Sequence, residues 1–399
     1  MRPFDGRRVL LVVSGGIAAY KSAFLSRRLI QAGASVDVIL TEAAQRFVGA
    51  ETFEGITGRQ VHTKLWQTAM AHLDLGKSAD VIVVAPATAD LISSMAVGGA
   101  KDLASATLLA AEAPVIVCPA MNTRMWKHPA TQANICSLLK FGYDIVGPAE
   151  GPLAEGESGV GRLVEPEEIM ASIGKALESH SRFEGLKVVV TAGPTRSSLD
   201  PVRFLSNRSS GRMGYSLARA SWRRGGSVTL ITGPAMPTST FGLSVIEVET
   251  AQEMQEALKA ELAEADVLIM TAAVADFEVV RMPDAKIKKE GSEGLTLSLH
   301  PGPDLLLETK SLREKNGIFT LGFALETEDA IENGRDKMER KGMQLVAVNV
   351  ANEPGAGFEV ETNRISLVHS SGKVEELPLA TKEELADQLL DHIESAMDE

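Results

Sequence analysis

Short apolar runs alternate with amphipathic, helix-like stretches along most of the chain. In the first half these runs are rich in β-branched residues, which is typical of strands buried on both faces of a parallel sheet. They cover residues 9–13, 36–40, 81–84, 115–118 and 144–146, and helical patterns cover residues 18–32, 43–47, 90–97, 104–110 and 165–179. Alternation of this kind predicts a doubly wound parallel sheet that binds ligands at the carboxyl ends of its strands.

The pattern begins again near residue 183. Each half opens with a strand, a glycine turn and a helix, first at Gly15–Gly16 and then at Gly193. We therefore predict an α/β protein with two Rossmann-like domains in tandem, residues 1–180 and 181–399. Strands of the second half are expected at residues 188–191, 228–231, 245–249, 267–271, 318–323, 345–349 and 364–368, before a last helix at residues 382–395.

Composition narrows the class of protein. A chain of 399 residues with 44% apolar and 23% charged residues is ordinary for a globular protein of two domains. The net charge of −13 argues against general nucleic-acid binding. Two cysteines, Cys118 and Cys136, cannot form a disulfide framework and favour the reducing cytoplasm. No apolar run approaches the ~18 residues that would predict a membrane span.

The first glycine turn is a candidate phosphate site. Gly15 and Gly16 follow a strand and precede a helix, so their backbone amides can face an anion at the helix N-terminus. Thr41 adds a hydroxyl at the same predicted sheet edge. Glycines at strand ends are also common turn residues, and Thr41 is equally well explained as a helix cap.

Three further motifs change this picture. AHLDL (71–75) carries His72, PATADL (86–91) follows a strand, and PAMN (119–122) ends another strand at Asn122. Together with GGIAAYK (15–21), they resemble the family of flavin-dependent cysteine decarboxylases. The resemblance implies a flavodoxin-like domain that binds FMN through Gly15, Gly16, Thr41, Pro86, Ala87 and Thr88.

The resemblance also assigns the chemistry. His72 would be the catalytic base and Asn122 would bind the substrate carboxylate. Oxidation of the cysteine CH2–SH to a thioaldehyde by flavin creates the electron sink for decarboxylation, and an imidazole titrates in the right range for the proton transfers. The alternatives are a structural histidine and an asparagine that only caps a turn.

A glycine-rich segment, residues 147–163, departs from the family. It is expected to form an irregular lid. The family usually has a proton-donating cysteine here, whereas this chain has Glu155 at that place. Three interpretations stay open: Glu155 or Glu157 donates the proton, another acid or water does so, or the domain releases an unreduced enethiol.

The second half begins with a donor-rich loop. Residues 191–214 contain several arginines, serines and Asn207, which suits a polyphosphate or simply makes a solvated basic loop. SNRSSGRMG (206–214), AAVAD (272–276), KIKK (286–289) and GFALET (322–327) resemble the phosphopantothenate–cysteine ligase domain. Fusion to the decarboxylase implies the bacterial type, which uses CTP rather than ATP, with Mg2+.

By this resemblance Asn207 would steady an acyl-cytidylate, and Lys286 would act at the reacting phosphate and acyl group. Attack of a carboxylate on an α-phosphate needs its charge offset by lysine and Mg2+. Lys288 and Lys289 are expected at the surface. The other predicted nucleotide-binding residues are Ser210, Gly211, Asp276, Phe323, Lys337 and Lys341.

Taken together, the motifs resemble the bifunctional decarboxylase/ligase family of coenzyme A biosynthesis. The resemblance implies ligation of 4′-phosphopantothenate to cysteine, decarboxylation to 4′-phosphopantetheine, and a homo-oligomer with trimeric decarboxylase and dimeric ligase contacts. An NAD-dependent oxidoreductase would need G-x-G-x-x-G, which SGGIAA (14–19) lacks. A non-catalytic flavoprotein would explain the missing cysteine, but it would need neither His72 nor Asn122.

Overall fold

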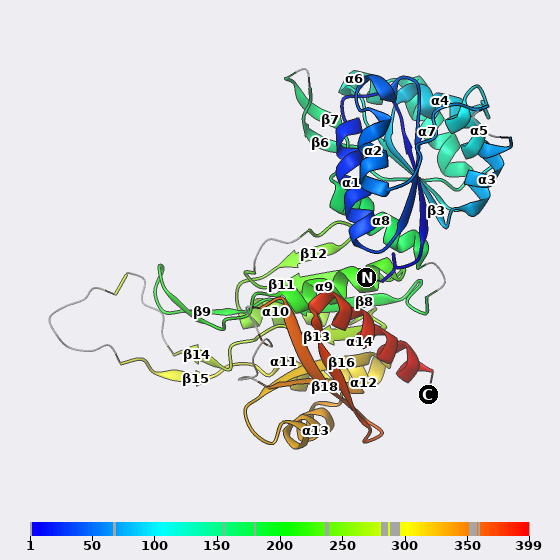
Figure 1. Cartoon of the computed structure of the whole chain (residues 1–399). Coiled ribbons are helices and arrows are strands. Elements are labelled where there is room, and N and C mark those ends of the chain that lie inside the picture. Colours follow the sequence, from blue (N-terminus) through cyan, green and yellow to red (C-terminus); the bar gives the residue numbers. More distant parts are fainter. Residues whose placement is uncertain are drawn as a thin grey trace. The chain divides into compact units, whose positions relative to one another are not determined.

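The computed structural model describes residues 2–66, 69–154, 156–178, 181–235, 239–280, 286–287, 296–350, 357 and 360–398. It divides into two compact units, Met1–Ser179 and His180–Glu399 (Figure 1). Each unit is built around its own sheet, so each is described by itself.

The N-terminal unit has a five-stranded parallel sheet in the order β2-β1-β3-β4-β5. Its central strands are almost wholly apolar and buried, because helices cover both faces of a parallel sheet. The order is that of flavodoxin-like folds and confirms the predicted class; its topological switch point lies between β1 and β3. The strands are β1 (Arg8–Val13), β2 (Ser35–Leu40), β3 (Val81–Ala87), β4 (Val115–Pro119) and β5 (Asp144–Ile145).

Helices connect these strands, and two local expectations were wrong. The predicted helix at residues 43–47 is a single 3-10 turn, Ala44–Arg46. Residues 147–163 contain an antiparallel hairpin, β6 (Ala149–Pro152) and β7 (Ser158–Arg162), instead of an irregular loop. Its glycines carry no side chains that could alternate, so no strand pattern was visible. The helices are α1 (Ala19–Gln31), α2 (Ala50–Thr57), α3 (Ala71–Ser78), α4 (Ala89–Ala96), α5 (Leu103–Leu109), α6 (Thr123–Lys127), α7 (Pro129–Lys140) and α8 (Pro166–Leu177).

The C-terminal unit has an eight-stranded sheet in the order β12-β11-β8-β13-β16-β17-β18-β19. Its first six strands are parallel and follow the doubly wound Rossmann order, as predicted, with the switch point between β8 and β13. The last two are antiparallel. The strands are β8 (Lys187–Ala192), β11 (Ser227–Thr232), β12 (Ser244–Glu247), β13 (Val267–Met270), β16 (Phe319–Glu326), β17 (Leu345–Val350), β18 (Thr362–His369) and β19 (Val374–Thr381).

Helices also cover this sheet, and two short ribbons extend from it. The ribbons are β9 (Arg196–Ser198) with β10 (Phe204–Ser206), and β14 (Phe277–Val279) with β15 (Leu299–Pro301). Among the described residues, no helix is long and apolar enough to cross a membrane. The helices are α9 (Arg212–Arg223), α10 (Ala251–Glu261), α11 (Leu305–Glu308), α12 (Lys310–Asn316), α13 (Ala330–Lys341) and α14 (Lys382–Met397).

A buried arginine ties three of these elements together. Arg313, in α12, is 1% exposed. It donates to the carbonyl oxygens of Leu306, Lys341 and Gly342 and to the hydroxyl of Thr320, at 2.6–2.9 Å. Two of these carbonyls close the C-terminal end of α13, where a cation is favourable. Arg313 therefore holds the end of the helix that carries Lys341.

Candidate functional sites

The glycine turn after β1 is held against the end of β3. Ser14 Oγ donates to the carbonyl of Pro86 at 2.7 Å and accepts from the backbone N–H of Thr88 at 2.9 Å. A Cβ on Gly15 would lie 2.3 Å from Cβ of Ala43, so only glycine lets the turn approach that loop. Within the described residues, no acceptor receives the N–H groups of Gly15 and Gly16.

Thr41 closes the same sheet edge from the neighbouring strand. Its backbone N–H donates to the carbonyl of Val13 at 3.1 Å, and its Oγ1 accepts from the N–H of Ala44 at 3.2 Å. This hydrogen bond resembles a cap, but the 3-10 turn that follows has Ala43 at its N-cap position, so Thr41 does not cap it as the alternative expected. A Cβ on Gly16 would lie 3.7 Å from Cγ2 of Thr88. The structure therefore gathers all of the predicted FMN-binding residues at the carboxyl ends of β1, β2 and β3: Gly15, Gly16, Thr41, Pro86, Ala87 and Thr88.

Asn122 lies at the end of the next strand. The N–H of Ala120 donates to the carbonyl of Ala87 at 3.0 Å, which places the PAMN loop beside the end of β3. The Asn122 side chain accepts from the N–H of Arg124 at 2.7 Å and so caps α6. The capping role considered for Asn122 is therefore present. The residue also lies at the edge of the predicted site.

The glycine-rich hairpin packs on this loop. The N–H of Met121 donates to the carbonyl of Gly161 at 2.9 Å. A Cβ on Gly161 would lie 2.1 Å from the Met121 carbonyl oxygen, so glycine is needed for this approach. Glu157 is exposed and pairs with Arg124 at 3.3 Å. Glu155 lies outside the described residues.

His72 lies elsewhere in the unit. It is half-buried at the second position of α3, and within the described part of the chain its side chain forms no hydrogen bond or ion pair. Figure 1 shows α3 on the opposite side of the N-terminal unit from β6 and β7. No hydrogen bond or ion pair joins the side chains of His72 and Asn122 in the described part of the chain.

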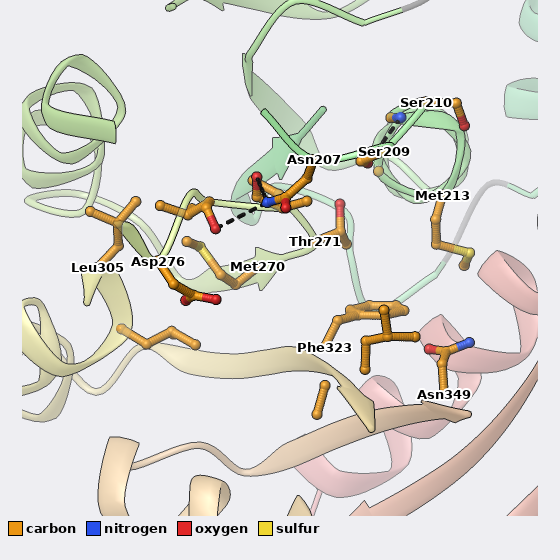
Figure 2. A pocket seen from close by; sticks show the side chains of 18 of the residues that line it. Asn207, Ser209, Ser210, Met213, Met270, Thr271, Asp276, Leu305, Phe323 and Asn349 are labelled. Carbon is orange, nitrogen blue, oxygen red and sulfur yellow. Dashed lines mark hydrogen bonds between the residues drawn. The ribbon is translucent and has the colours of Figure 1, made fainter. Parts of the chain in front are cut away.

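The C-terminal unit has a cavity of about 570 Å³ at the carboxyl ends of β13 and β16. Figure 2 shows side chains from the donor-rich loop on one wall and Phe323 and Asn349 on another. The lining residues come from several separate segments of sequence. They include seven of the predicted ligase residues: Asn207, Ser210, Gly211, Asp276, Phe323, Lys337 and Lys341.

One wall is the start of α9. Gly211 has φ of 76°, and a Cβ there would lie 2.9 Å from Cβ of Ala235 and 3.2 Å from the Gly193 nitrogen. Glycine is therefore required on both conformational and steric grounds. Ser209 Oγ accepts from the Gly211 N–H at 3.3 Å. A helix N-terminus beside hydroxyls is a suitable place for phosphate oxygens.

Asn207 is oriented by two backbone carbonyls. Its Nδ2 donates to Ala273 at 3.0 Å and to Val274 at 3.2 Å (Figure 2). These bonds determine which way the amide points, so its Oδ1 is left to accept from a ligand. The AAVAD loop and the donor-rich loop are joined by this side chain.

Two lysines of α13 lie on the cavity, each beside a carboxylate. Lys337 pairs with Glu326 at 2.5 Å, and Lys341 pairs with Asp304 at 3.1 Å. Lys286 is exposed and does not belong to the cavity lining in the described residues; its neighbours 281–285 and 288–290, with Lys288 and Lys289, lie outside them.

Sequence reasoning missed part of this wall. Asn349, Asn363 and Lys382 also line the cavity. Burial, with Arg212 nearby, lowers the pKa of Lys382 to about 8. Its Nζ donates to the carbonyl of Gly357 at 2.9 Å. Asn349 ends the predicted strand 345–349, Asn363 precedes the predicted strand 364–368, and Lys382 begins the predicted helix 382–395. Those positions were the available signal, and only the tertiary structure brings the three residues to one cavity.

Sequence comparisons agree with this organisation. The family model described as "Flavoprotein" matches residues 2–178, and the one described as "DNA/pantothenate metabolism flavoprotein C-terminal domain" matches residues 183–397. The coenzyme A biosynthesis bifunctional protein CoaBC of Vibrio vulnificus (strain CMCP6) is 40% identical over 100% of both chains. That of Bacillus subtilis (strain 168) is 42% identical over 98% of this chain and 97% of the relative.

A solved structure, the C-terminal domain of a coenzyme A biosynthesis bifunctional protein CoaBC, is 31% identical, with a TM-score of 0.46. It covers 54% of this chain and 97% of that one. The predicted family and the predicted pair of activities are confirmed by the full-length relatives and the two family matches. The chain belongs to the family of bifunctional CoaBC proteins of coenzyme A biosynthesis, enzymes with a decarboxylase and a ligase activity.

Proposed function

We propose that the C-terminal unit joins 4′-phosphopantothenate to cysteine at the expense of CTP. The observation that carries this proposal is the gathering of seven predicted residues on one cavity at the sheet's carboxyl edge. The substrate carboxylate attacks the α-phosphate of CTP, forming an acyl-cytidylate and releasing pyrophosphate. The amine of cysteine then attacks the acyl carbon, forming the amide and releasing CMP.

The cavity residues have distinct roles in this reaction. The N-terminus of α9, with Ser210 and Gly211, receives phosphate oxygens. Lys337 and Lys341 exchange their present carboxylate partners for the triphosphate, which is a stronger anionic partner. The Oδ1 of Asn207 positions the acyl-cytidylate. Asp276 and Phe323 flank the nucleoside, and Mg2+ accompanies the triphosphate.

Lys286 has a separate place in the proposal. It is exposed and lies apart from the cavity lining. Its role at the reacting phosphate therefore requires Lys286 to approach the cavity when substrate binds. A lysine outside the cavity before binding adds its charge only in the closed complex, where it offsets the charge of the transition state.

We further propose that the N-terminal unit decarboxylates the resulting phosphopantothenoylcysteine to 4′-phosphopantetheine with FMN. The residues present fit this cofactor, because the turn at Gly15 and Gly16 leaves two N–H groups for a phosphate at a helix N-terminus. FMN, when bound, supplies the two-electron redox chemistry. Asn122 binds the substrate carboxylate, and His72 moves the proton. The remaining surface of the proposed FMN site is formed by Pro86, Ala87 and Thr88.

The position of α3, which carries His72, on the opposite side of the unit from the β6–β7 hairpin beside Asn122 supports a homo-oligomer in which two copies complete one site. Exposed apolar side chains next to the glycine turn supply a surface for this contact: Ile17, Tyr20 and Phe24 are 62%, 51% and 60% exposed. A trimer satisfies this need for the N-terminal unit. A dimer of the C-terminal unit completes the proposed assembly.

The proton donor of the lid is the remaining part of the proposal. We assign it to Glu155 or Glu157. Glu157 is on the described part of the hairpin, which packs on the Asn122 loop. The Glu155→Gln and Glu157→Gln variants are compared for release of reduced product or of enethiol. An unchanged yield of phosphopantetheine in both variants assigns the donation to another acid or to water.

The proposed compartment is the cytoplasm, where free thiols are kept reduced. Cys118 and Cys136 are both free cysteines. The partners are the small-molecule substrates, with no nucleic acid and no membrane.

The test is a coupled assay on the full chain. We would supply phosphopantothenate, cysteine, Mg2+ and either CTP or ATP, record the flavin spectrum, and follow products by mass. The proposal expects bound FMN and phosphopantetheine with CTP. Accumulated phosphopantothenoylcysteine would refute the decarboxylase half alone. Absence of pyrophosphate with either nucleotide would refute the ligase half.

A further inference from the structure

Two histidines and a glutamate meet at the far end of the C-terminal sheet. His369 ends β18, Glu375 lies near the start of β19, and His392 projects from α14. One potential ligand atom from each lies within 4.8 Å of the others, and all three residues are half-buried. None of the three lines the cavity of the ligase site.

The geometry centres on one carboxylate oxygen. Glu375 Oε1 lies 2.9 Å from His369 Nε2 and 3.4 Å from His392 Nδ1. The two imidazole rings meet edge to face, with centroids 5.7 Å apart. Ligand atoms around a tetrahedral zinc ion, with bonds of about 2.0–2.2 Å, lie roughly 3.3–3.5 Å apart. Small side-chain rotations would therefore bring these atoms to coordination distance.

Several basic side chains compete for the one carboxylate oxygen at the centre of the cluster. His369 Nε2 and Glu375 Oε1 are buried and close, yet they are not in hydrogen-bond alignment in the described structure. A buried imidazole nitrogen without an aligned hydrogen bond costs free energy, and a cation bound to both atoms would recover it. Lys373 Nζ approaches the same oxygen at 2.9 Å, but its side chain is 62% exposed and can turn to solvent.

We propose that His369, Glu375 and His392 form a binding site for one divalent transition cation, and that Zn2+ is the ion they suit best. Two imidazoles and one carboxylate are ligands that Zn2+ accepts, with water in the fourth position. The ion joins the β18–β19 hairpin to α14. Those elements carry Asn363 and Lys382, which line the ligase cavity. The bound metal therefore stabilises the side of the cavity that these two residues form.

The experiment titrates untagged, chelator-treated full-length protein with Zn2+ by calorimetry, in a Cys136→Ser background that removes the exposed thiol. We expect one Zn2+ per chain and a rise in the melting temperature. Glu375→Gln and His392→Gln should each weaken binding by at least ~100-fold. His300→Gln, which changes an exposed histidine elsewhere in the unit, serves as the control and should leave binding unchanged.

The Lys373→Met variant gives the decisive measurement. The Lys373 side chain is exposed, so it can be replaced without disturbing the core. Removing the competing ammonium should tighten Zn2+ binding by about tenfold. Co2+ should show the visible absorption of a tetrahedral site in this variant. Absence of 1:1 binding, or binding unaffected by Glu375→Gln, His392→Gln and Lys373→Met, would overturn the proposal and leave the cluster as an ion pair. Neither outcome bears on the proposal that this unit catalyses the ligase reaction.

Discussion

The two units use the same edge of the sheet in different ways. In the C-terminal unit, side chains from distant segments converge on one cavity within a single copy of the chain. In the N-terminal unit, the glycine turn, Thr41 and Asn122 share an edge, while α3, the helix that carries His72, lies on the opposite side of the unit from β6 and β7 (Figure 1). Both arrangements follow the rule that ligands bind at a topological switch point. The difference shows that a topological switch point provides the backbone edge on which a ligand can bind. A complete site also needs side chains that surround the ligand on its other sides.

The walls come from different sources. The C-terminal unit extends its parallel sheet with β18, β19 and α14, which add Asn363 and Lys382 to the cavity. Among its described residues, the N-terminal unit has the short hairpin β6–β7 and an exposed apolar surface beside its glycine turn. In the proposed homo-oligomer, a second copy of the chain supplies the wall that this unit does not build from its described residues.

The largest expected effect tests this difference directly. His72→Ala should lower decarboxylation by about 10²–10⁴-fold, because the proton transfer loses its imidazole. Asn122→Ala should also inactivate it. Co-expression of the two variants should restore activity to about a quarter of wild type in randomly mixed oligomers that share sites. The matched pair for the ligase, Asn207→Asp with Lys341→Met, should show no recovery, since both residues line one cavity. Failure of the first pair to recover would refute a shared site.

Arg313→Met should destabilise the C-terminal unit by about 3–5 kcal/mol, because buried carbonyl oxygens lose their donor. Denaturant unfolding followed for the two units separately checks this. Arg219→Met, which removes a surface arginine with a 3.7 Å ion pair, should change stability by less than about 0.5 kcal/mol. A similar loss for both variants would contradict the role given to Arg313.

Asn207→Asp should lower ligation by about 10²–10³-fold and leave decarboxylation of supplied phosphopantothenoylcysteine unchanged. The substitution keeps the shape but removes both bonds to the AAVAD loop and places a negative charge beside the phosphates. Asn316→Asp makes the same change at a remote carbonyl contact and should retain ligation. Pyrophosphate release measures both. Equal losses would indicate a general effect on folding.

The smallest effect concerns Lys382. Its pKa is about 8 in the folded unit, below the usual 10.5, because burial and Arg212 disfavour its charge. The unfolded chain then binds more protons between pH 8 and 10.5, so stability should rise with pH across that window. Below pH 8 Lys382 is charged in both the folded and the unfolded chain, so its full unfavourable contribution to the stability of the folded unit is present. Lys382→Met should flatten this rise by an amount on the order of 1 kcal/mol, measured by unfolding at several pH values. An unchanged slope would refute the lowered pKa.

Much of the fold could be predicted because short, continuous apolar runs indicate buried parallel strands. β1, β3, β8 and β13 are such runs, and their glycine turns indicated the binding edges. β19 was missed because it combines Pro378 with weak alternation at the edge of the sheet. The short ribbons were missed for a similar reason, since three residues make too little pattern.

The sequence by itself determined the two-domain α/β architecture, the family and the residue types at each switch point, because these depend on local pattern and motif. Tertiary structure decided which of those residues meet. Asn207, Asp276, Phe323 and Lys341 come together because the Rossmann order returns separate strands to one edge. His72 comes from α3, which packs on the sheet, whereas Asn122 comes from the loop at the end of β4, and no hydrogen bond joins them in the described residues. Distance along a chain carries no information about such long-range packing, which is set by how whole elements bury their apolar faces.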